Sequence, residues 1–269
     1  MTNSELKVLA LLIVLIGGGA AIWHFYDDLV PSQAVVVVTP PEPMVESIPE
    51  PTGPLHPVEP PEAPETGEII EELPPLDDSD ASFVTALIDT MGTDVESLLL
   101  TEALIDRFVA TVDNLPRKHV SEKIRPAGRL PTPFIAAATT DEASFVLGPD
   151  NFGRYDAMVD LLAVADVDAV VALYRRYYPL FQESYERLGY PNDYFNDRVV
   201  EVIDHLLLTP APQGPIQLVR PHVLFVFADP DLEALSSGQK LLLRMGNENA
   251  ARVNEVLVTL RPWLVVHQD

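Results

Sequence analysis

Apolar residues recur at intervals of three and four through most of residues 76–269, which is the spacing of one face of an α-helix. One such face comprises Leu104, Phe108, Thr111, Val112 and Leu115. A second comprises Val167, Val170, Val171, Tyr174, Phe181, Tyr185 and Leu188. A third comprises Phe195, Val199, Val202, Ile203 and Leu206. These patterns predict helices that each bury one side against a common core.

Glycine, proline and capping residues predict where these helices end. The helix that follows the acidic run LDDSD is expected to stop at Gly92, since acids favour helix starts and glycine favours helix ends. Thr101 is the expected N-cap of the next helix, which Pro116 ends. Pro179 is expected to kink or split the helix over residues 166–188, because proline lacks the N–H that a helix interior uses.

The helical pattern breaks down over residues 117–153 and again near residue 220. The stretches PFIAAA and SFVLG indicate a short hairpin, and the β-branched and aromatic run Val223–Phe227 indicates further short strands. Two more helices, separated by Gly246, are expected to close the chain. The predicted fold class is therefore a mainly α domain over residues 76–269, with one or two short β-hairpins.

The N-terminus has a different pattern, with no Asp, Glu, Lys or Arg in residues 8–26 (VLALLIVLIGGGAAIWHFY). As a helix this stretch spans about 28 Å, close to the thickness of a bilayer core of about 30 Å. Trp23, Phe25 and Tyr26 cluster at one end, as in an interfacial aromatic belt. We expect a retained single transmembrane helix. A cleaved signal peptide is the alternative, but the stretch lacks a clean A-x-A site.

Lys7 sets the expected orientation, because no Lys or Arg follows it until Arg107. The positive-inside rule then places residues 1–7 in the cytoplasm. The expected location is the inner membrane, with residues 76–269 in the periplasm of a bacterium with two membranes.

Residues 27–75 are predicted to be a disordered linker, because residues 31–75 hold 13 of the 26 prolines, nine Glu and no basic residue. The whole chain carries 41 acidic and 17 basic residues, a net charge of −24. Nucleic acid is therefore not an expected partner, since proteins bind it mainly through Lys and Arg. The absence of cysteine excludes disulfides and thiolate metal sites.

Asp197, Glu201 and His205 are spaced four residues apart and share one helical face. Two carboxylates and a histidine can bind a divalent metal or carry out acid–base chemistry. A solvated helix face is the competing interpretation, because the chain has no zinc-protease, calcium-loop, nucleophile-elbow, P-loop or dinucleotide motif. The sequence therefore assigns no catalytic residue, cofactor or metal.

A basic segment stands out in this acidic domain: residues 117–129 contain Glu122 as their single acid, with Arg117, Lys118, Lys123, Arg125 and Arg129. Such a cluster predicts contact with an anionic lipid headgroup or an acidic partner. The alternative is a loop that the domain's own carboxylates neutralise. A separate feature, three consecutive leucines at 241–243, subtends about 200° of a helix and suggests that part of this surface meets another copy of the chain.

Several long strings together resemble one protein family: FVATVDNLPR, YDAMVDLLAVAD, YYPLFQESYERLGYPNDYFNDRVVEVIDHLL and FADPDLEALSSGQKLLLRMG. The chain is similar, over about residues 74–265, to the bacterial family catalogued as domain of unknown function 3014. The resemblance implies an anchored envelope protein and supplies no site residue.

The leading functional hypothesis is a non-enzymatic interaction or assembly module that binds an envelope protein. A homo-oligomeric structural protein is one alternative. The other is an envelope hydrolase acting through Glu183, Asp197, Glu201, Asp204 and His205.

Overall fold

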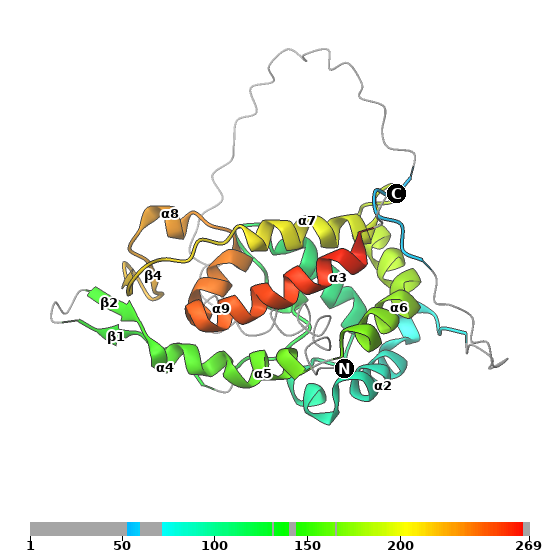
Figure 1. Cartoon of the computed structure of the whole chain (residues 1–269), viewed down its shortest axis with the longest axis horizontal. Coiled ribbons are helices and arrows are strands. Elements are labelled where there is room, and N and C mark those ends of the chain that lie inside the picture. Colours follow the sequence, from blue (N-terminus) through cyan, green and yellow to red (C-terminus); the bar gives the residue numbers. More distant parts are fainter. Residues whose placement is uncertain (1–52, 60–71, 131, 140–143, 165, 266–269) are drawn as a thin grey trace, which may run out of the picture.

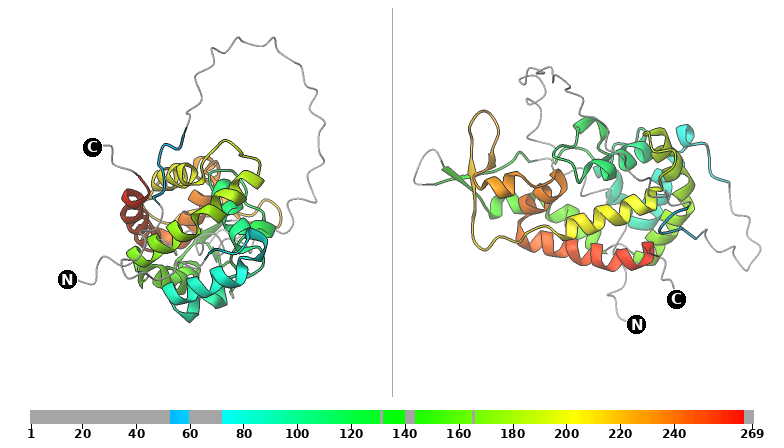
Figure 2. Two further views of the ribbon diagram at one scale, coloured as in Figure 1. Left: turned by 90° about the vertical axis from the view of Figure 1, so that its right-hand side faces the viewer. Right: turned by 90° about the horizontal axis from the view of Figure 1, so that it is seen from above.

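The computed structural model describes residues 53–59, 72–130, 132–139, 144–164 and 166–265. Together they form an elongated body of packed helices with a small sheet at one end (Figure 1, Figure 2). The predicted transmembrane stretch, residues 8–26, lies outside these residues. Within the part that the structure describes, no helix has the length and apolar character needed to cross a membrane.

The described chain is mainly helical, as predicted. The α-helices are α2 (Asp80–Met91), α3 (Leu104–Asn114), α4 (Pro149–Phe152), α5 (Asp156–Val164), α6 (Val167–Arg187), α7 (Phe195–Leu207), α8 (Pro230–Glu233) and α9 (Ser237–Leu264). Short 3₁₀ turns are η2 (Leu76–Asp78), η3 (Thr93–Leu98), η4 (Glu122–Ile124) and η5 (Gly153–Tyr155).

The two predicted hairpins combine into one antiparallel sheet in the order β1-β2-β3-β4. Its strands are β1 (Ala137–Ala138), β2 (Ser144–Leu147), β3 (Ile216–Val219) and β4 (Val226–Phe227). The central pairing joins β2 to β3, with Ser144 opposite Val219. This pairing links segments about 70 residues apart in the chain, so local patterns did not reveal it.

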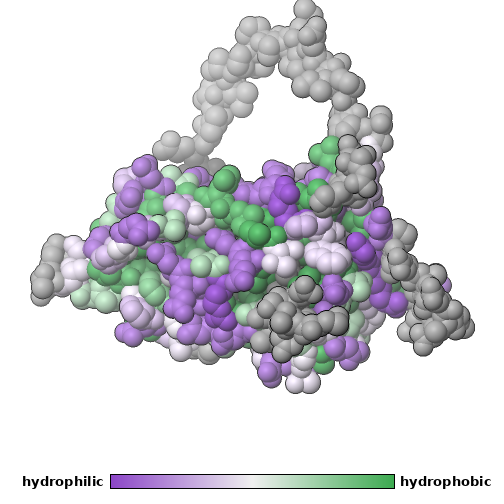
Figure 3. All heavy atoms as spheres, viewed as in Figure 1, coloured by the Kyte–Doolittle hydropathy of each residue, from purple (hydrophilic) through white to green (hydrophobic). Residues whose placement is uncertain are grey.

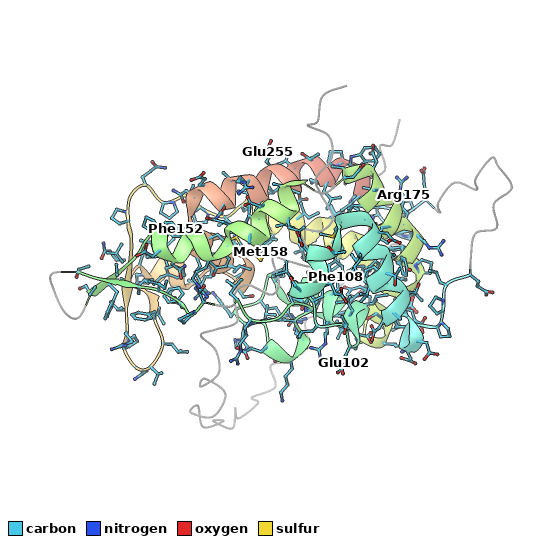
Figure 4. All side chains as sticks on the ribbon, turned by 90° about the horizontal axis from the view of Figure 1, so that it is seen from below. Glu102, Phe108, Phe152, Met158, Arg175 and Glu255 are labelled. Atoms are coloured by element: carbon cyan, nitrogen blue, oxygen red, sulfur yellow. The ribbon has the colours of Figure 1, made fainter. Side chains whose placement is uncertain are left out.

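The main core lies between α2, α3, α6, α7 and α9, where the three predicted apolar faces meet. Phe181 of α6 is at its centre, with its ring 5.3 Å from that of Phe108 and 5.8 Å from that of Phe195. Figure 4 shows Phe108 and Met158 inside the body, and Glu102 and Glu255 on its outside. All residues of the three faces are buried except Leu188, which is 42% exposed.

Helix α9 has a sharp break at Gly246, where φ is +81° and ψ is 161°. The predicted separation of two helices at this residue is confirmed. A Cβ atom at Gly246 would lie 2.6 Å from the ring of Phe152. Glycine is therefore required both by the positive φ and by the close approach of Phe152. The helix starts with a capping box between Ser236 and Gln239.

The structure tests two predicted helix details: the N-cap at Thr101 is wrong, and of the kink or split predicted at Pro179 the split is excluded. Helix α3 is not capped by Thr101: the carboxylate of Asp80 on α2 accepts the backbone N–H groups of Ala103 and Leu104, at 2.7 and 2.8 Å. Helix α6 runs through Pro179 as one helix instead of splitting there. In the first case a side chain from another helix performs the capping role, which the spacing around residue 101 does not show.

The three leucines at 241–243 are all buried, with exposed fractions of 6%, 1% and 3%. Leu241 and Leu242 belong to the main core, whereas Leu243 packs in a second, small core beneath the sheet. The prediction that part of this surface meets another chain is therefore wrong, because α9 lies between two cores of the same chain.

The outer surface mixes polar and apolar side chains. On the face in Figure 3, apolar residues gather along the upper middle part, and hydrophilic residues cover much of the rest. Among the exposed large apolar residues, Trp263 lies near the C-terminal end of α9 and Val223 lies in the turn between β3 and β4.

Candidate functional site

Residues 53–59 bind to the helical body as a segment that bends at Leu55 and His56, here called the docked segment. The two carboxylate oxygens of Asp197 accept the consecutive backbone N–H groups of Leu55 and His56, at 2.9 and 2.7 Å. The side-chain amide of Asn196 donates to the carbonyl of His56 at 2.8 Å. Figure 1 shows the docked segment in blue beside the C-terminal end of α9, away from the sheet. This differs from a linker that is disordered throughout residues 27–75.

Asn196 connects the docked segment to three helices. It is fully buried in the first turn of α7, and its Oδ1 accepts a hydrogen bond from the hydroxyl of Tyr174 on α6 at 3.0 Å. Its Nδ2 also donates to the carbonyl of Leu264 on α9 at 2.9 Å. Burial raises the pKa of Tyr174 well above its ordinary value, so the hydroxyl stays protonated and able to donate. These bonds hold the amide in a fixed orientation toward His56.

Asp197 is placed by the start of the same helix. It lies in the first turn of α7, where the N-terminal end of the helix dipole favours a negative charge. Its carboxylate accepts the two N–H groups of the docked segment. Such charge-assisted bonds to backbone donors are about twice as strong as bonds between neutral groups.

A pocket of about 240 Å³ lies on one side of the docked segment. It is here called the Trp263 pocket, and its lining includes Val58, Val171, Tyr174, Arg175, Trp263 and Val265. Val58 also packs against the main core. The pocket therefore has an aromatic and aliphatic lining with polar groups from Glu59, Arg175 and Asn196, and the docked segment forms part of its wall.

A larger cleft of about 580 Å³ lies on the other side of the docked segment. It is here called the tyrosine cleft, and its lining includes Leu55, Arg117, Tyr185, Tyr190, Tyr194 and Glu201. Burial raises the pKa of Tyr185 above its ordinary value, so this phenol is neutral at physiological pH. The docked segment thus forms part of the wall of both hollows.

Asp113, at the C-terminal end of α3, is the centre of the polar network under the tyrosine cleft. Its side chain is 3% exposed and accepts from Arg117 at 2.7 Å and from Nε of Arg198 at 3.0 Å. The hydroxyl of Tyr190 also points to it, at 3.4 Å. Arg198 continues the network to Glu201 at 2.7 Å. The network joins α3, α7 and the connection between α6 and α7.

The structure separates the residues of the predicted carboxylate and histidine face. Asp197 and Glu201 line the tyrosine cleft, but His205 does not: its Nε2 lies 2.8 Å from the hydroxyl of Ser236 at the start of α9. Burial, and then the charge of Arg198, lower the pKa of His205 below its ordinary value. No group of three or more metal-ligating side chains occurs in the part of the chain that the structure describes.

Two further carboxylates of the hydrolase hypothesis form ion pairs elsewhere. Glu183 pairs with Arg187 at 2.6 Å, and Asp204 pairs with Arg261 at 2.5 Å. The structure therefore places only Asp197 and Glu201, of the five residues in that hypothesis, in one hollow.

The basic residues of segment 117–129 do not form one uniform patch. Arg117 faces the tyrosine cleft, Lys118 donates to the carbonyl of Ala234, and Arg129 pairs with Glu122 at 2.6 Å.

Arg125 of this segment is 6% exposed, and burial lowers its pKa to about 10. The other four basic residues of the segment, Arg117, Lys118, Lys123 and Arg129, are exposed. Contact of the segment with an anionic partner stays a prediction, to which the buried guanidinium of Arg125 adds little.

Asn196 and Asp113 are the residues of this site that the sequence patterns did not reveal. Asn196 occupies the position after the first residue of an apolar face, where a polar residue normally faces solvent. Asp113 follows Val112 near a helix end and looked like an ordinary helix terminus. Their roles come from partners 68 and 85 residues away in the chain, and such partners leave no local signal.

The fold and the site define a class: a mainly helical domain with a four-stranded antiparallel sheet, which holds a segment of its own N-terminal extension. The model of the family described as Protein of unknown function (DUF3014) matches residues 104–261, and the chain belongs to this family. The match includes Asp113, Asn196 and Asp197 and begins after the docked segment. No curated protein and no solved structure matches the chain.

Proposed function

We propose that this protein is a non-enzymatic interaction module of the cell envelope, held at the membrane by residues 8–26 and carried into the periplasm on its proline-rich linker. The anchor and the location rest on the charge-free stretch and on Lys7. Deletion of residues 1–26 should move the protein from the membrane fraction to the soluble fraction. Retention in the membrane fraction would contradict the anchor.

The docked segment carries the proposal, because in it the domain binds a short peptide segment of its own chain through backbone groups. Asn196 and Asp197 contact only backbone groups of that segment through their hydrogen bonds. Recognition through the backbone tolerates variation in peptide sequence, while an adjoining pocket for one side chain supplies specificity. The hollows on both sides of the segment give such a pocket.

The arrangement of the carboxylates favours binding over catalysis. Acid–base catalysis needs a protonatable group within reach of a substrate in one cleft. Asp197 accepts two backbone N–H groups and Glu201 pairs with Arg198, so each already has a structural partner. No observation on the described residues favours the hydrolase hypothesis over the interaction module.

The test is site-specific photo-crosslinking of the full-length protein in cells. A photoreactive amino acid replaces Trp263, which is 47% exposed beside the docked segment, or Val223, which is 62% exposed at the sheet end. The expected result is a crosslink to another envelope protein from position 263 and none from position 223. The additional change Asp197→Ala should abolish that crosslink if the partner binds in the groove that holds the docked segment.

Equal crosslinking from both positions would contradict the proposal, because it would show contacts that do not depend on the groove. Crosslinks that persist unchanged in the Asp197→Ala background would have the same meaning. The thermal unfolding of each variant serves as the control, since Asp197 lies on the surface of α7 and its loss should leave the fold intact.

A further inference from the structure

We propose that the docked segment holds the place of a partner peptide, and that the groove takes a segment with two consecutive free backbone N–H groups at a bend, followed by proline and a bulky apolar side chain. The inference rests on the proposed function and names the chemistry of the partner. The groove comprises Asn196 and Asp197 of α7 with the Trp263 pocket beside them. The docked segment, GPLHPVE, shows which chemistry fits.

The hydrogen bonds define what each position of the peptide provides. Residues at the positions of Leu55 and His56 must carry an N–H, because Asp197 accepts both. Proline is accepted at the next position, since no hydrogen bond is made by that nitrogen. The carbonyl before it accepts from Asn196. These requirements exclude proline at the first two positions and select a backbone that bends there, because two consecutive N–H groups reach one carboxylate.

The Trp263 pocket beside Val58 has room for a side chain larger than valine. Val58 packs against the main core and also lines the Trp263 pocket, which measures about 240 Å³. Leucine or phenylalanine at this position would place more apolar surface against Tyr174, Trp263 and Val265. One additional buried methylene strengthens binding about fourfold. The protein's own segment is therefore a weaker occupant than a peptide with a bulkier residue.

The connection between the docked segment and the domain explains why a weaker occupant is present. Residues 60–71 join Glu59 to Glu72 in sequence, so the docked segment binds intramolecularly, at an effective concentration on the order of mM. A partner peptide therefore displaces the docked segment only when the peptide binds the groove more tightly than the docked segment does. Displacement also lengthens the tether to the predicted anchor, because residues 53–59 then no longer contact the domain.

The experiment measures peptide binding by fluorescence anisotropy, with full-length protein in detergent micelles. The probe is a labelled peptide of residues 53–59, used alongside the same peptide with leucine in place of Val58. Leu55→Pro with His56→Pro removes both N–H groups of the internal segment and leaves residues 72–265 unchanged. This double variant should bind the probe at least about tenfold more tightly than the wild type, and the leucine peptide about fourfold more tightly again.

A matched control adds Asp197→Ala to the double variant, and this change should abolish binding of both peptides. Failure of the double variant to bind either peptide would overturn the inference, while crosslinking from position 263 would still test the proposed function separately. Equal affinity for the two peptides would overturn the role of the Trp263 pocket. Dimerisation that requires both the docked segment and Asp197 would show that the groove binds a second copy of the chain. It would overturn the proposal that a separate partner protein binds there.

Discussion

The helical end of the molecule and its sheet end differ in how much side-chain surface they bury and in how their polar groups are paired. The helical end holds the main core, which draws residues from Leu76 to Leu264, together with the Asp113 network and the docked segment. The sheet end has a small core that comprises Leu147, Ile216, Leu218, Phe227 and Leu243. Its strands are two to four residues long.

This difference favours the helical end as the place where a partner binds. A recognition site is more precise when helices fix its side chains, and Asn196 is held by three helices. The sheet end has fewer buried apolar groups, so its amides should open at a lower free energy than those of the helical core. Three predictions test or sharpen this comparison.

The largest expected effect is on the helical core. Phe181→Ala should lower the free energy of unfolding by about 3–5 kcal/mol, because it leaves a cavity among large buried side chains. The ring of Phe181 contacts those of Phe83 at 5.6 Å and Tyr174 at 5.6 Å. Urea denaturation followed by circular dichroism measures the change.

Phe225→Ala at the sheet end is the matched control. Phe225 is half-buried and contacts Phe145 at 4.8 Å. Its loss should cost clearly less than the loss of Phe181. A larger effect at Phe225 would reverse the comparison between the two ends.

A second, intermediate effect concerns the break in α9, which joins the two ends. Gly246→Ala should lower the free energy of unfolding by about 1–3 kcal/mol for the positive φ, with a further loss because the Cβ meets Phe152 at 2.6 Å. Hydrogen exchange measures where the loss occurs. Protection should fall more at Leu218 of β3 than at Val109 of α3.

Gly92→Ala is the control for backbone strain alone. Gly92 has φ +87° and ψ 167°, almost the same conformation as Gly246, but nothing lies within 4 Å of a Cβ placed there. The two substitutions should therefore differ by the cost of the contact with Phe152. Equal losses would show that Phe152 moves aside without cost.

Much of the helical end could be predicted from the sequence because its signals are local. Apolar residues at intervals of three and four marked the buried faces of α3, α6 and α7, and Gly92 and Gly246 marked helix ends. Each of these signals depends on residues within one or two turns of each other. Helix periodicity is reliable for that reason.

The candidate site could not be predicted, because it depends on pairs that are far apart in the chain. Asp197 binds a segment about 140 residues earlier, and the proline and glutamate content of that segment predicted disorder. Leu241 and Leu243 face different cores, which no property of α9 alone reveals. Composition describes an isolated segment, whereas docking depends on the surface that receives it.

The smallest expected effect is the pH dependence of the ion pair between Asp204 and Arg261, which joins α7 to α9 near the docked segment. The hydrogen bond from Arg261 holds the pKa of Asp204 below its ordinary value of 3.8. The unfolded chain therefore binds the proton more readily, so the stabilisation is present above about pH 4 and is lost as the pH falls through the lower, folded pKa. Both side chains are substantially exposed, so the contribution should stay below about 1 kcal/mol.

Asp204→Asn and Arg261→Gln, alone and together, separate this pair from other titrating groups. Each single variant should lose stability at pH 7 relative to the wild type, and the double variant should lose less than the sum. The difference between wild type and Asp204→Asn should shrink as the pH falls below 3.8. Urea titrations at several pH values measure it. A difference that stays constant down to about pH 2 would show that Asp204 stabilises α7 and α9 without its charge, and the ion pair with Arg261 would then not be the source of the stabilisation.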